Sequence, residues 1–195
     1  MTGKGGAQDQ RWAQLATART AYERQVASSY DEVLLEVAAR VQAAGSIGKS
    51  DIGALLLWKR LRADTLWARR LMSLPDLEVR TTTARAVDAV RDERASTPAA
   101  AFQGRRLLSS LPGFTTGDAL ASAVLVAAAP RRMAVYDKRA HRGLELLGET
   151  LSSSPGRYGR YMQLIDDLLN LVHQHDHTWI ARDVDLALYW LGRSH

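Results

Sequence analysis

Apolar residues recur at spacings of three and four along most of the chain, and this period predicts amphipathic helices. The first such stripe covers residues 9–44, with Ser28-Ser29 as an expected interruption. Further helices are predicted at residues 51–61, 65–73, 76–91, 101–110, 118–129, 138–147, 158–173 and 183–191. Because no segment alternates apolar and polar residues as a half-buried strand does, the sequence predicts an all-α fold.

The length and composition fit a single helical domain. A chain of 195 residues with 46% hydrophobic residues can form one well-buried domain or two small helical lobes that share a cleft. We expect residues 1–8, which are polar and glycine-rich, to be a disordered tail, and residues 9–195 to form the domain. The absence of cysteine excludes disulfides and thiolate metal sites. No apolar run approaches the roughly 20 residues that span a bilayer, and no signal peptide is visible, so we expect a cytoplasmic location and no membrane partner.

A glycine-containing turn joins two of the predicted helices. The segment Leu-Pro-Gly-Phe-Thr-Thr-Gly-Asp-Ala occupies residues 111–119, inside a helix–turn–helix unit that covers residues 101–129. Pro112 presets its own φ, and Gly113 accepts a positive φ, so the pair favours a tight turn. The second helix is apolar almost all round and is therefore expected to be buried. Such a unit can lay backbone N–H groups and carbonyls along a nucleic-acid backbone.

This stretch resembles the hairpin of the helix-hairpin-helix superfamily of base-excision DNA glycosylases, related to endonuclease III and the 8-oxoguanine glycosylases. Their hairpin has the pattern Leu-Pro-Gly-hydrophobic-Gly-x-x-x-Ala, and a catalytic Asp follows about twenty residues later. The positions that match are Leu111, Pro112, Gly113, Phe114 and Ala119, and Asp137 lies twenty positions after Gly117. Two positions depart from the pattern: Thr115 replaces the second hairpin glycine, and Gly117 stands where bifunctional members carry a lysine nucleophile. The match covers residues 100–150 in detail.

The resemblance implies a two-lobed helical fold in which the N- and C-terminal segments together form the second lobe. It implies duplex DNA as the partner, with Pro112, Gly113, Thr115 and Gly117 approaching a phosphate through the backbone. No cofactor is expected, apart from a monovalent cation that the resemblance allows at the hairpin carbonyls. Because the lysine is missing from the position of Gly117, a Schiff-base lyase reaction is not expected from that site.

Asp137 is the candidate catalytic residue. Breaking the N-glycosidic bond of a base builds positive charge on the deoxyribose, and a fixed carboxylate stabilises that charge and can orient or deprotonate the attacking water. The same residue precedes a predicted helix, where an Asp is also a good N-cap. Lys138, Arg139 and Arg142 follow it and are candidate phosphate contacts.

An extruded base needs an aromatic or apolar pocket in which to stack. Tyr136 is the best placed wall because it adjoins Asp137, and Trp67 is a further candidate. Trp58 is a third possible wall, but its pattern favours a core aromatic. Asp183, in the first turn of the last predicted helix, either caps that helix or lies at the mouth of the cleft.

The charge of the chain is unevenly distributed. The net charge is +5, and residues 58–70 and 129–142 each carry an excess of four positive charges. This distribution favours a polyanionic partner on one face of the molecule.

Two motifs that suggest other sites are weak. In the run His173-Gln174-His175-Asp176-His177, two histidines share a helical face, but the run lies at a helix end and lacks a fourth ligand, so no metal site is expected. Gly48-Lys49-Ser50 resembles the end of a P-loop, but Ala43 occupies the position of its first glycine and no strand precedes it. No nucleotide cofactor is expected.

The resemblance therefore implies a monofunctional DNA glycosylase that uses Asp137 and water. Two other functions are compatible with the same residues. One is a helix-hairpin-helix protein that binds DNA without catalysis, and the other is a helical adaptor whose basic faces meet acidic protein partners.

Overall fold

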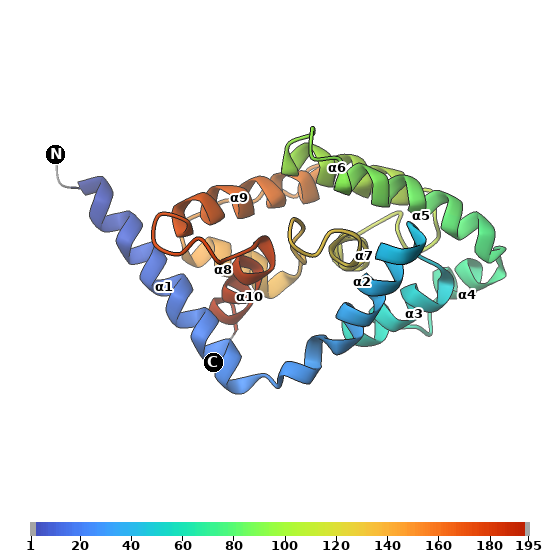
Figure 1. The fold of residues 1–195 in the computed structure, drawn as a ribbon, viewed down its shortest axis with the longest axis horizontal. Helices are drawn as coiled ribbons and strands as arrows, with labels where there is room; N and C mark the ends of the chain where they lie inside the picture. Colours follow the sequence, from blue (N-terminus) through green and yellow to red (C-terminus); the bar gives the residue numbers. More distant parts are fainter. Residues whose placement is uncertain (1–2, 194–195) are drawn as a thin grey trace.

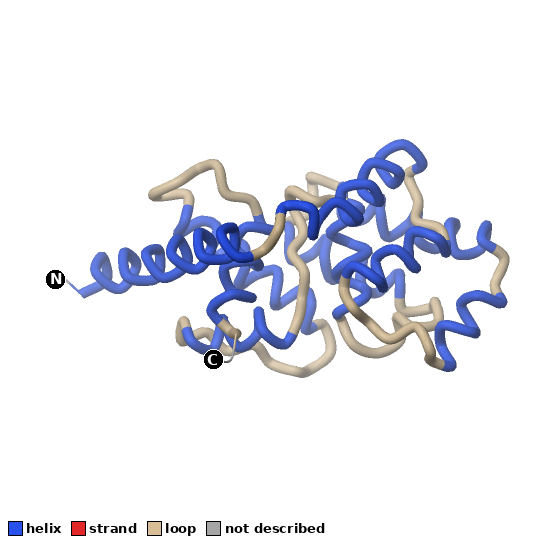
Figure 2. Tube along the Cα trace, turned by 90° about the horizontal axis from the view of Figure 1, so that it is seen from below, coloured by secondary structure: helices blue, strands red, loops and turns tan. Residues whose placement is uncertain are grey.

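The computed structural model describes residues 3–193, and the side chains of residues 6–193 (Figures 1 and 2). Within this range the chain forms ten α-helices, one 3-10 helix and no strand, which confirms the all-α prediction. None of these helices is both apolar enough and long enough to traverse a bilayer. The elements are α1 (Gly3–Gln25), η1 (Ser28–Asp31), α2 (Glu32–Ala44), α3 (Lys49–Trp58), α4 (Leu66–Ser73), α5 (Asp76–Arg91), α6 (Thr97–Leu108), α7 (Ala119–Ala128), α8 (Lys138–Leu146), α9 (Arg157–Val172) and α10 (Ala181–Leu191).

The helices fall into two groups according to their contacts (Figure 1). In the terminal group, α10 packs against α1, α8 and α9. In the central group, α2 packs against α3 and α7, and α5 packs against α6 and α7. The contact between α6 and α9 joins the groups, and the chain crosses between them at η1 and again at residues 129–137. The first and last helices of the chain therefore belong to the same group.

Helix α7 lies at the centre of the central group. Residues 120–128 are all buried, and the helix contacts α2, α3, α5 and α6. Its run of Ala and Val side chains explains this position, because a helix without a polar face is stable only when apolar neighbours surround it. Ser122, the polar member of the run, donates to the carbonyls of Ala119 and Tyr136. That second hydrogen bond ties the segment before α8 to the core.

Several helix bounds differ from those expected from the hydrophobic period. Helix α1 begins at Gly3, within the predicted tail, where the sequence has no apolar stripe to mark a helix. Residues 6–10 are exposed. Residues 1 and 2 of that tail lie outside the described residues. Helix α6 begins at Thr97, where Pro98 fits the first turn because that turn needs no N–H donor. Helix α3 ends at Trp58, and Arg60 follows with a φ of 53°.

Two glycines allow α8 and α10 to approach with their backbones nearly in contact. A Cβ atom at Gly143 would overlap the carbonyl group of Leu188, and one at Gly192 would overlap the carbonyl group of Arg139. A methyl group at either position would therefore push the helices apart. This close packing fixes the N-terminal end of α8, which carries Asp137.

Candidate active site

A cavity of about 610 Å³ lies where the two groups of helices meet. Its wall combines segments that are far apart in the sequence, from the end of α1 to the end of α10. Both aromatic and ionisable side chains contribute. The lining residues are Tyr22, Val26, Tyr30, Trp58, Lys59, Arg60, Leu61, Gly117, Asp118, Ala119, Val135, Tyr136, Asp137, Lys138, Arg139, Ala140, Arg157, Arg182, Asp185, Leu186 and Tyr189.

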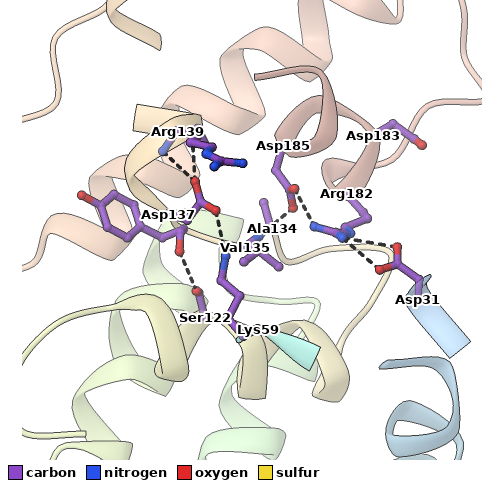
Figure 3. Close-up of polar contacts among 12 residues, drawn as sticks. Asp31, Lys59, Ser122, Ala134, Val135, Asp137, Arg139, Arg182, Asp183 and Asp185 are labelled. Carbon is purple, nitrogen blue, oxygen red and sulfur yellow. Dashed lines mark hydrogen bonds and ion pairs between the residues drawn. The ribbon is translucent and has the colours of Figure 1, made fainter. Parts of the chain in front are cut away.

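Asp137 faces this cavity from the N-terminus of α8 (Figure 3). Its Oδ1 accepts hydrogen bonds from the backbone N–H groups of Arg139 at 2.7 Å and Ala140 at 2.9 Å. Its Oδ2 accepts one from Nζ of Lys59 at 3.0 Å. The Asp137 side chain is 22% exposed and that of Lys59 is 12% exposed. The carboxylate is therefore held in one orientation at the edge of the cavity.

The contacts of Asp137 keep it ionised. Burial raises the pKa of this carboxyl, but the charge of Lys59 and the N–H groups of Ala140 and Arg139 lower it, and the net effect places the pKa below its ordinary value. A carboxylate at a helix N-terminus is further stabilised by the helix dipole. Asp137 is thus available as a negative charge at neutral pH.

A second carboxylate, Asp185, faces the same cavity from α10. Its Oδ2 accepts the backbone N–H of Val135 at 2.7 Å, and its Oδ1 accepts Nη1 of Arg182 at 2.6 Å. Arg182 also reaches Asp31, with Nη2 lying 3.3 Å from both carboxylate oxygens (Figure 3). Burial raises the pKa of Asp185 to about 6 against the opposing effect of Arg182. Asp185 therefore links the segment before α8 to α10 and, through Arg182, to η1.

Aromatic rings form the apolar part of the wall. Tyr136 packs edge-on against Tyr161 at 5.3 Å, and the guanidinium of Arg157 lies 4.6 Å from the centre of the Tyr136 ring. Trp58 lies under the guanidinium of Arg182, and its Nε1 donates to Asp31 at 3.0 Å. Trp58, for which the sequence favoured a place in the core, is buried and also lines the cavity.

The turn between α6 and α7 covers residues 109–118 and reaches the cavity at its last positions. Gly113 and Gly117 have φ values of 90° and 74°, in the region that favours glycine. Thr115, Thr116 and Gly117 are exposed. Their backbone amides have no acceptor among residues 3–193. These N–H groups are therefore donors without a partner among the described residues, on an exposed part of the turn.

Arg105, on α6, holds the turn from its inner side. Its guanidinium donates to the carbonyls of Phe114 at 2.8 Å and Gly117 at 2.7 Å, and to Oδ1 of Asp118 at 2.8 Å. Asp118 also accepts a hydrogen bond from Arg157 at 2.7 Å. A side-chain cation thus neutralises two carbonyl oxygens of the turn.

The residues predicted to form the site are divided between the cavity and its surroundings. Those that line the cavity are Gly117, Tyr136, Asp137, Lys138 and Arg139. Those outside its lining are Trp67, Pro112, Gly113, Thr115, Arg142 and Asp183.

Two of the candidates for the base pocket have structural contacts instead. Trp67 packs against Gly113, where its ring fills the space that a Cβ atom would take. Asp183 accepts the backbone N–H of Ile180 at 2.8 Å and so caps α10, and it pairs with Arg19 beside a separate cavity of about 410 Å³. Asp185, two residues later, points from the other side of the helix into the main cavity.

Some of the predicted basic surface serves the fold. Arg132 donates to the carbonyls of Val90 and Asp92 at the end of α5. Arg139 donates to the hydroxyl of Tyr189 at 2.5 Å and lies over its ring. Lys59 pairs with Asp137, as described above. The local charge excess therefore overstates the number of cations that point toward solvent.

The histidine run near the end of α9 makes ordinary contacts. The ring of His173 contacts the carbonyl of Trp179 at 2.9 Å, and His175 stacks on Trp12 with the rings nearly parallel. Over the part of the chain that the structure describes, no three His, Asp or Glu side chains converge as metal ligands would.

Comparisons with known proteins add no relative. No family model matches the chain, and neither a curated protein nor a solved structure matches it.

Proposed function

We propose that this protein is a DNA N-glycosylase that removes an extruded base, with Asp137 as the catalytic carboxylate. The observation that carries the proposal is the position of Asp137. It is an ionised carboxylate, fixed by two backbone amides, at the edge of an aromatic cavity and beside an exposed glycine turn. Each of these parts has a role in base excision.

The turn and its neighbours supply the DNA contacts. The exposed amides of Thr115, Thr116 and Gly117 can donate to phosphate oxygens, which fixes the position of the duplex without reading its sequence. Lys138 and Arg60 line the same cavity as Gly117 and add positive charge there. Arg105 supplies from within the chain the charge for which a bound monovalent cation would otherwise be needed.

The cavity can accept a base once it leaves the helical stack. Its volume lies in the range of roughly 300–1,000 Å³ that is usual for small-molecule sites. Tyr30, Trp58 and Tyr136 line the cavity, so an extruded base would meet aromatic side chains there, which would compensate in part for its unstacking energy.

In the reaction, the glycosidic C–N bond breaks and its electron pair leaves with the base. Positive charge then develops on the sugar, and the carboxylate of Asp137 stabilises that charge. The N–H groups of Arg139 and Ala140 hold the carboxylate in place before the reaction begins. The site therefore does not have to reorganise as charge develops, and this preorganisation is the main source of electrostatic catalysis.

The test is a panel of duplex oligonucleotides that each carry one oxidised, deaminated, alkylated or bulky base. We expect the protein to bind these duplexes with an affinity that falls steeply with salt, and to release the base from at least one of them. An affinity for DNA that is independent of salt, together with no base release, would overturn the proposal and favour a protein-binding adaptor.

A second function, DNA binding without catalysis, has one observation in its favour. Both oxygens of Asp137 already have partners in the fold, so the residue also serves as the N-cap of α8 and as the partner of Lys59. Salt-dependent binding to every duplex of the panel with no base release from any of them would select this alternative.

A further inference from the structure

We propose that the groove between α1 and the loop that joins α9 to α10 is a binding site for an organic cation, an alkylammonium or guanidinium group. This groove is the cavity of about 410 Å³ beside Asp183, and it shares no lining residue with the main cavity. A ligand in the groove is therefore independent of base excision in the main cavity.

One face of α1 forms one side of the groove. The lining residues of this helix extend from Trp12 to Glu23 at spacings of mainly three and four, which place them on the same side of the helix. Ala16 and Thr20, which lie between them, have small side chains that leave space. The loop between α9 and α10 and the first turn of α10 form the opposite side, next to α1 (Figure 1).

Two indole rings meet in the wall of the groove. The rings of Trp12 and Trp179 lie 5.5 Å apart with an interplanar angle of 63°, so together they form a corner. His175 stacks on Trp12 at 5.2 Å with nearly parallel planes, and the carbonyl of Trp179 contacts Nε2 of His173 at 2.9 Å. These contacts hold both indoles in place, so the corner is formed before a ligand binds.

Asp176 adds a fixed negative charge to the same lining. Its Oδ1 accepts the N–H of Thr178 at 2.9 Å and the hydroxyl of Thr178 at 2.7 Å. These hydrogen bonds, with a smaller contribution from the side chain of Trp179, hold the pKa of the Asp176 carboxyl below its ordinary value. Asp176 is therefore ionised at neutral pH.

The groove is negatively charged, in contrast to the chain as a whole. Arg19 is the one basic residue of its described lining, and it pairs with Asp183 at 2.8 Å and with Glu23 at 2.6 Å. Asp176 adds a third carboxylate to this single cation. Because the net charge of the chain is +5, the groove is a local site that repels phosphates and attracts cations.

An organic cation fits this combination of rings and carboxylates. The face of an indole attracts a cation through the ring quadrupole, and this attraction is larger when the cation is desolvated. The CH₂ groups next to an ammonium or guanidinium also bury apolar surface against the rings. A lysine or arginine side chain of a polypeptide and a free alkylamine carry the same cationic group, so both sources must be probed.

The test is an NMR titration of the full chain that follows the indole N–H resonances of Trp12 and Trp179. The probes are choline, n-butylguanidinium and 3,3-dimethylbutan-1-ol, which has the shape of choline without its charge. We expect saturable shifts of both resonances with the two cations, and binding of the neutral alcohol that is at least about fivefold weaker. Blocked glycine pentapeptides with a central lysine or arginine test the second source. Tighter binding of a peptide than of the free cations would identify a polypeptide as the ligand, and equal or weaker binding would identify a small amine.

Variants separate the carboxylate from the rings. Asp176→Asn keeps an oxygen for the hydrogen bonds of Thr178 but loses the charge, so affinity for both cations should fall at least about threefold. Trp179→Leu removes one wall of the corner and should abolish the shift at Trp12. Asp88→Asn, an exposed residue of α5, is the control and should bind as wild type does. If thermal unfolding shows that Trp179→Leu is not folded, Asp176→Asn and the neutral alcohol decide.

Three results would each overturn the cation site. They are equal affinity for choline and the neutral alcohol, wild-type affinity of Asp176→Asn for both cations, and no shift of either indole resonance at saturating concentrations of the probes. None of them affects the glycosylase proposal, which depends on base release from the lesion panel. Failure of base release would likewise leave the cation site standing.

Discussion

Nζ of Lys59 lies 3.0 Å from Oδ2 of Asp137, although 78 residues separate them in the chain. The contact joins the end of α3, in the central group of helices, to the start of α8, in the terminal group. It bridges the two groups at the edge of the main cavity, and it gives Asp137 a different partner at each oxygen. A substitution that changes the charge but keeps the shape can therefore separate catalysis from folding.

Asp137→Asn should lower base release by about 10²–10⁴-fold while DNA affinity changes less than about threefold. The amide retains an oxygen that can accept the N–H groups of Arg139 and Ala140, so the cap of α8 persists. It loses the negative charge that stabilises the sugar cation. Single-turnover release and binding to the same duplex provide the two measurements.

The matched control for that prediction is Asp88→Asn, an exposed residue of α5 away from the cavity. It should release base at the wild-type rate. If Asp137→Asn also retained the wild-type rate, Asp137 would have no part in the chemistry.

The burial of Asp185 predicts a pH-dependent contribution to stability. Burial raises the pKa of this carboxyl from 3.8 to about 6 in the fold, so between these values the folded chain binds more protons than the unfolded chain. This group therefore makes the free energy of unfolding fall as the pH rises from about 4 to about 6. Asp185→Asn lacks the titration. The free energy of unfolding of the wild type minus that of the variant should therefore decrease from about pH 4 to about pH 6 and stay constant at higher pH. Urea unfolding at a series of pH values measures this difference.

Arg105→Ala should destabilise the protein by about 2 kcal/mol and weaken DNA binding, because hydrogen bonds from a charged donor to partly buried acceptors are among the stronger ones. The substitution removes the donor for the carbonyls of Phe114 and Gly117, whereas Asp118 retains Arg157. Arg106→Ala, on the exposed side of α6, is the control and should change stability by less than about 0.5 kcal/mol. Equal effects of the two substitutions would show that the turn does not depend on Arg105.

Gly143→Ala should destabilise the fold by about 1–3 kcal/mol or more, since the new methyl group would overlap the backbone of Leu188 and neither helix can move freely. Gly53→Ala, in an exposed part of α3 with no neighbour within 4 Å of the new atom, should instead be neutral or stabilising by up to about 1 kcal/mol. Thermal or denaturant unfolding of the pair tests the prediction, and equal stabilities would contradict it.

The helical architecture could be predicted because helix formation depends on residues that are close in the sequence. The period of three and four marks buried helix faces, and it predicted an all-α chain and the buried environment of α7. The same period cannot detect helical turns that lack an apolar stripe. The pattern therefore predicted a start at residue 9, whereas α1 begins at Gly3. A helix end that depends on one residue does not change the hydrophobic period. The end of α3, which Arg60 follows with a positive φ, could therefore not be predicted from that period.

Residues of the candidate site could be predicted from the sequence only where they lie next to a recognisable motif. Asp137 and Tyr136 were found through their spacing from the hairpin. Lys59 was noticed only as one charge in a basic run, because its partner comes from a distant helix and no local pattern encodes that contact. Asp183 was the predicted cavity residue, but Asp185 lines the main cavity, because tertiary packing decides which side of α10 faces it.

The residues that line the cavity range along the sequence from Tyr22 to Tyr189. During synthesis, a growing polypeptide that lacks α10 already contains Asp137 and Lys59, but it has neither Asp185 nor the helix that backs α8. The site is completed only when the last helix has emerged and docked. A prematurely terminated or C-terminally clipped product would therefore carry Asp137 and Lys59 without the part of the cavity wall that α10 provides.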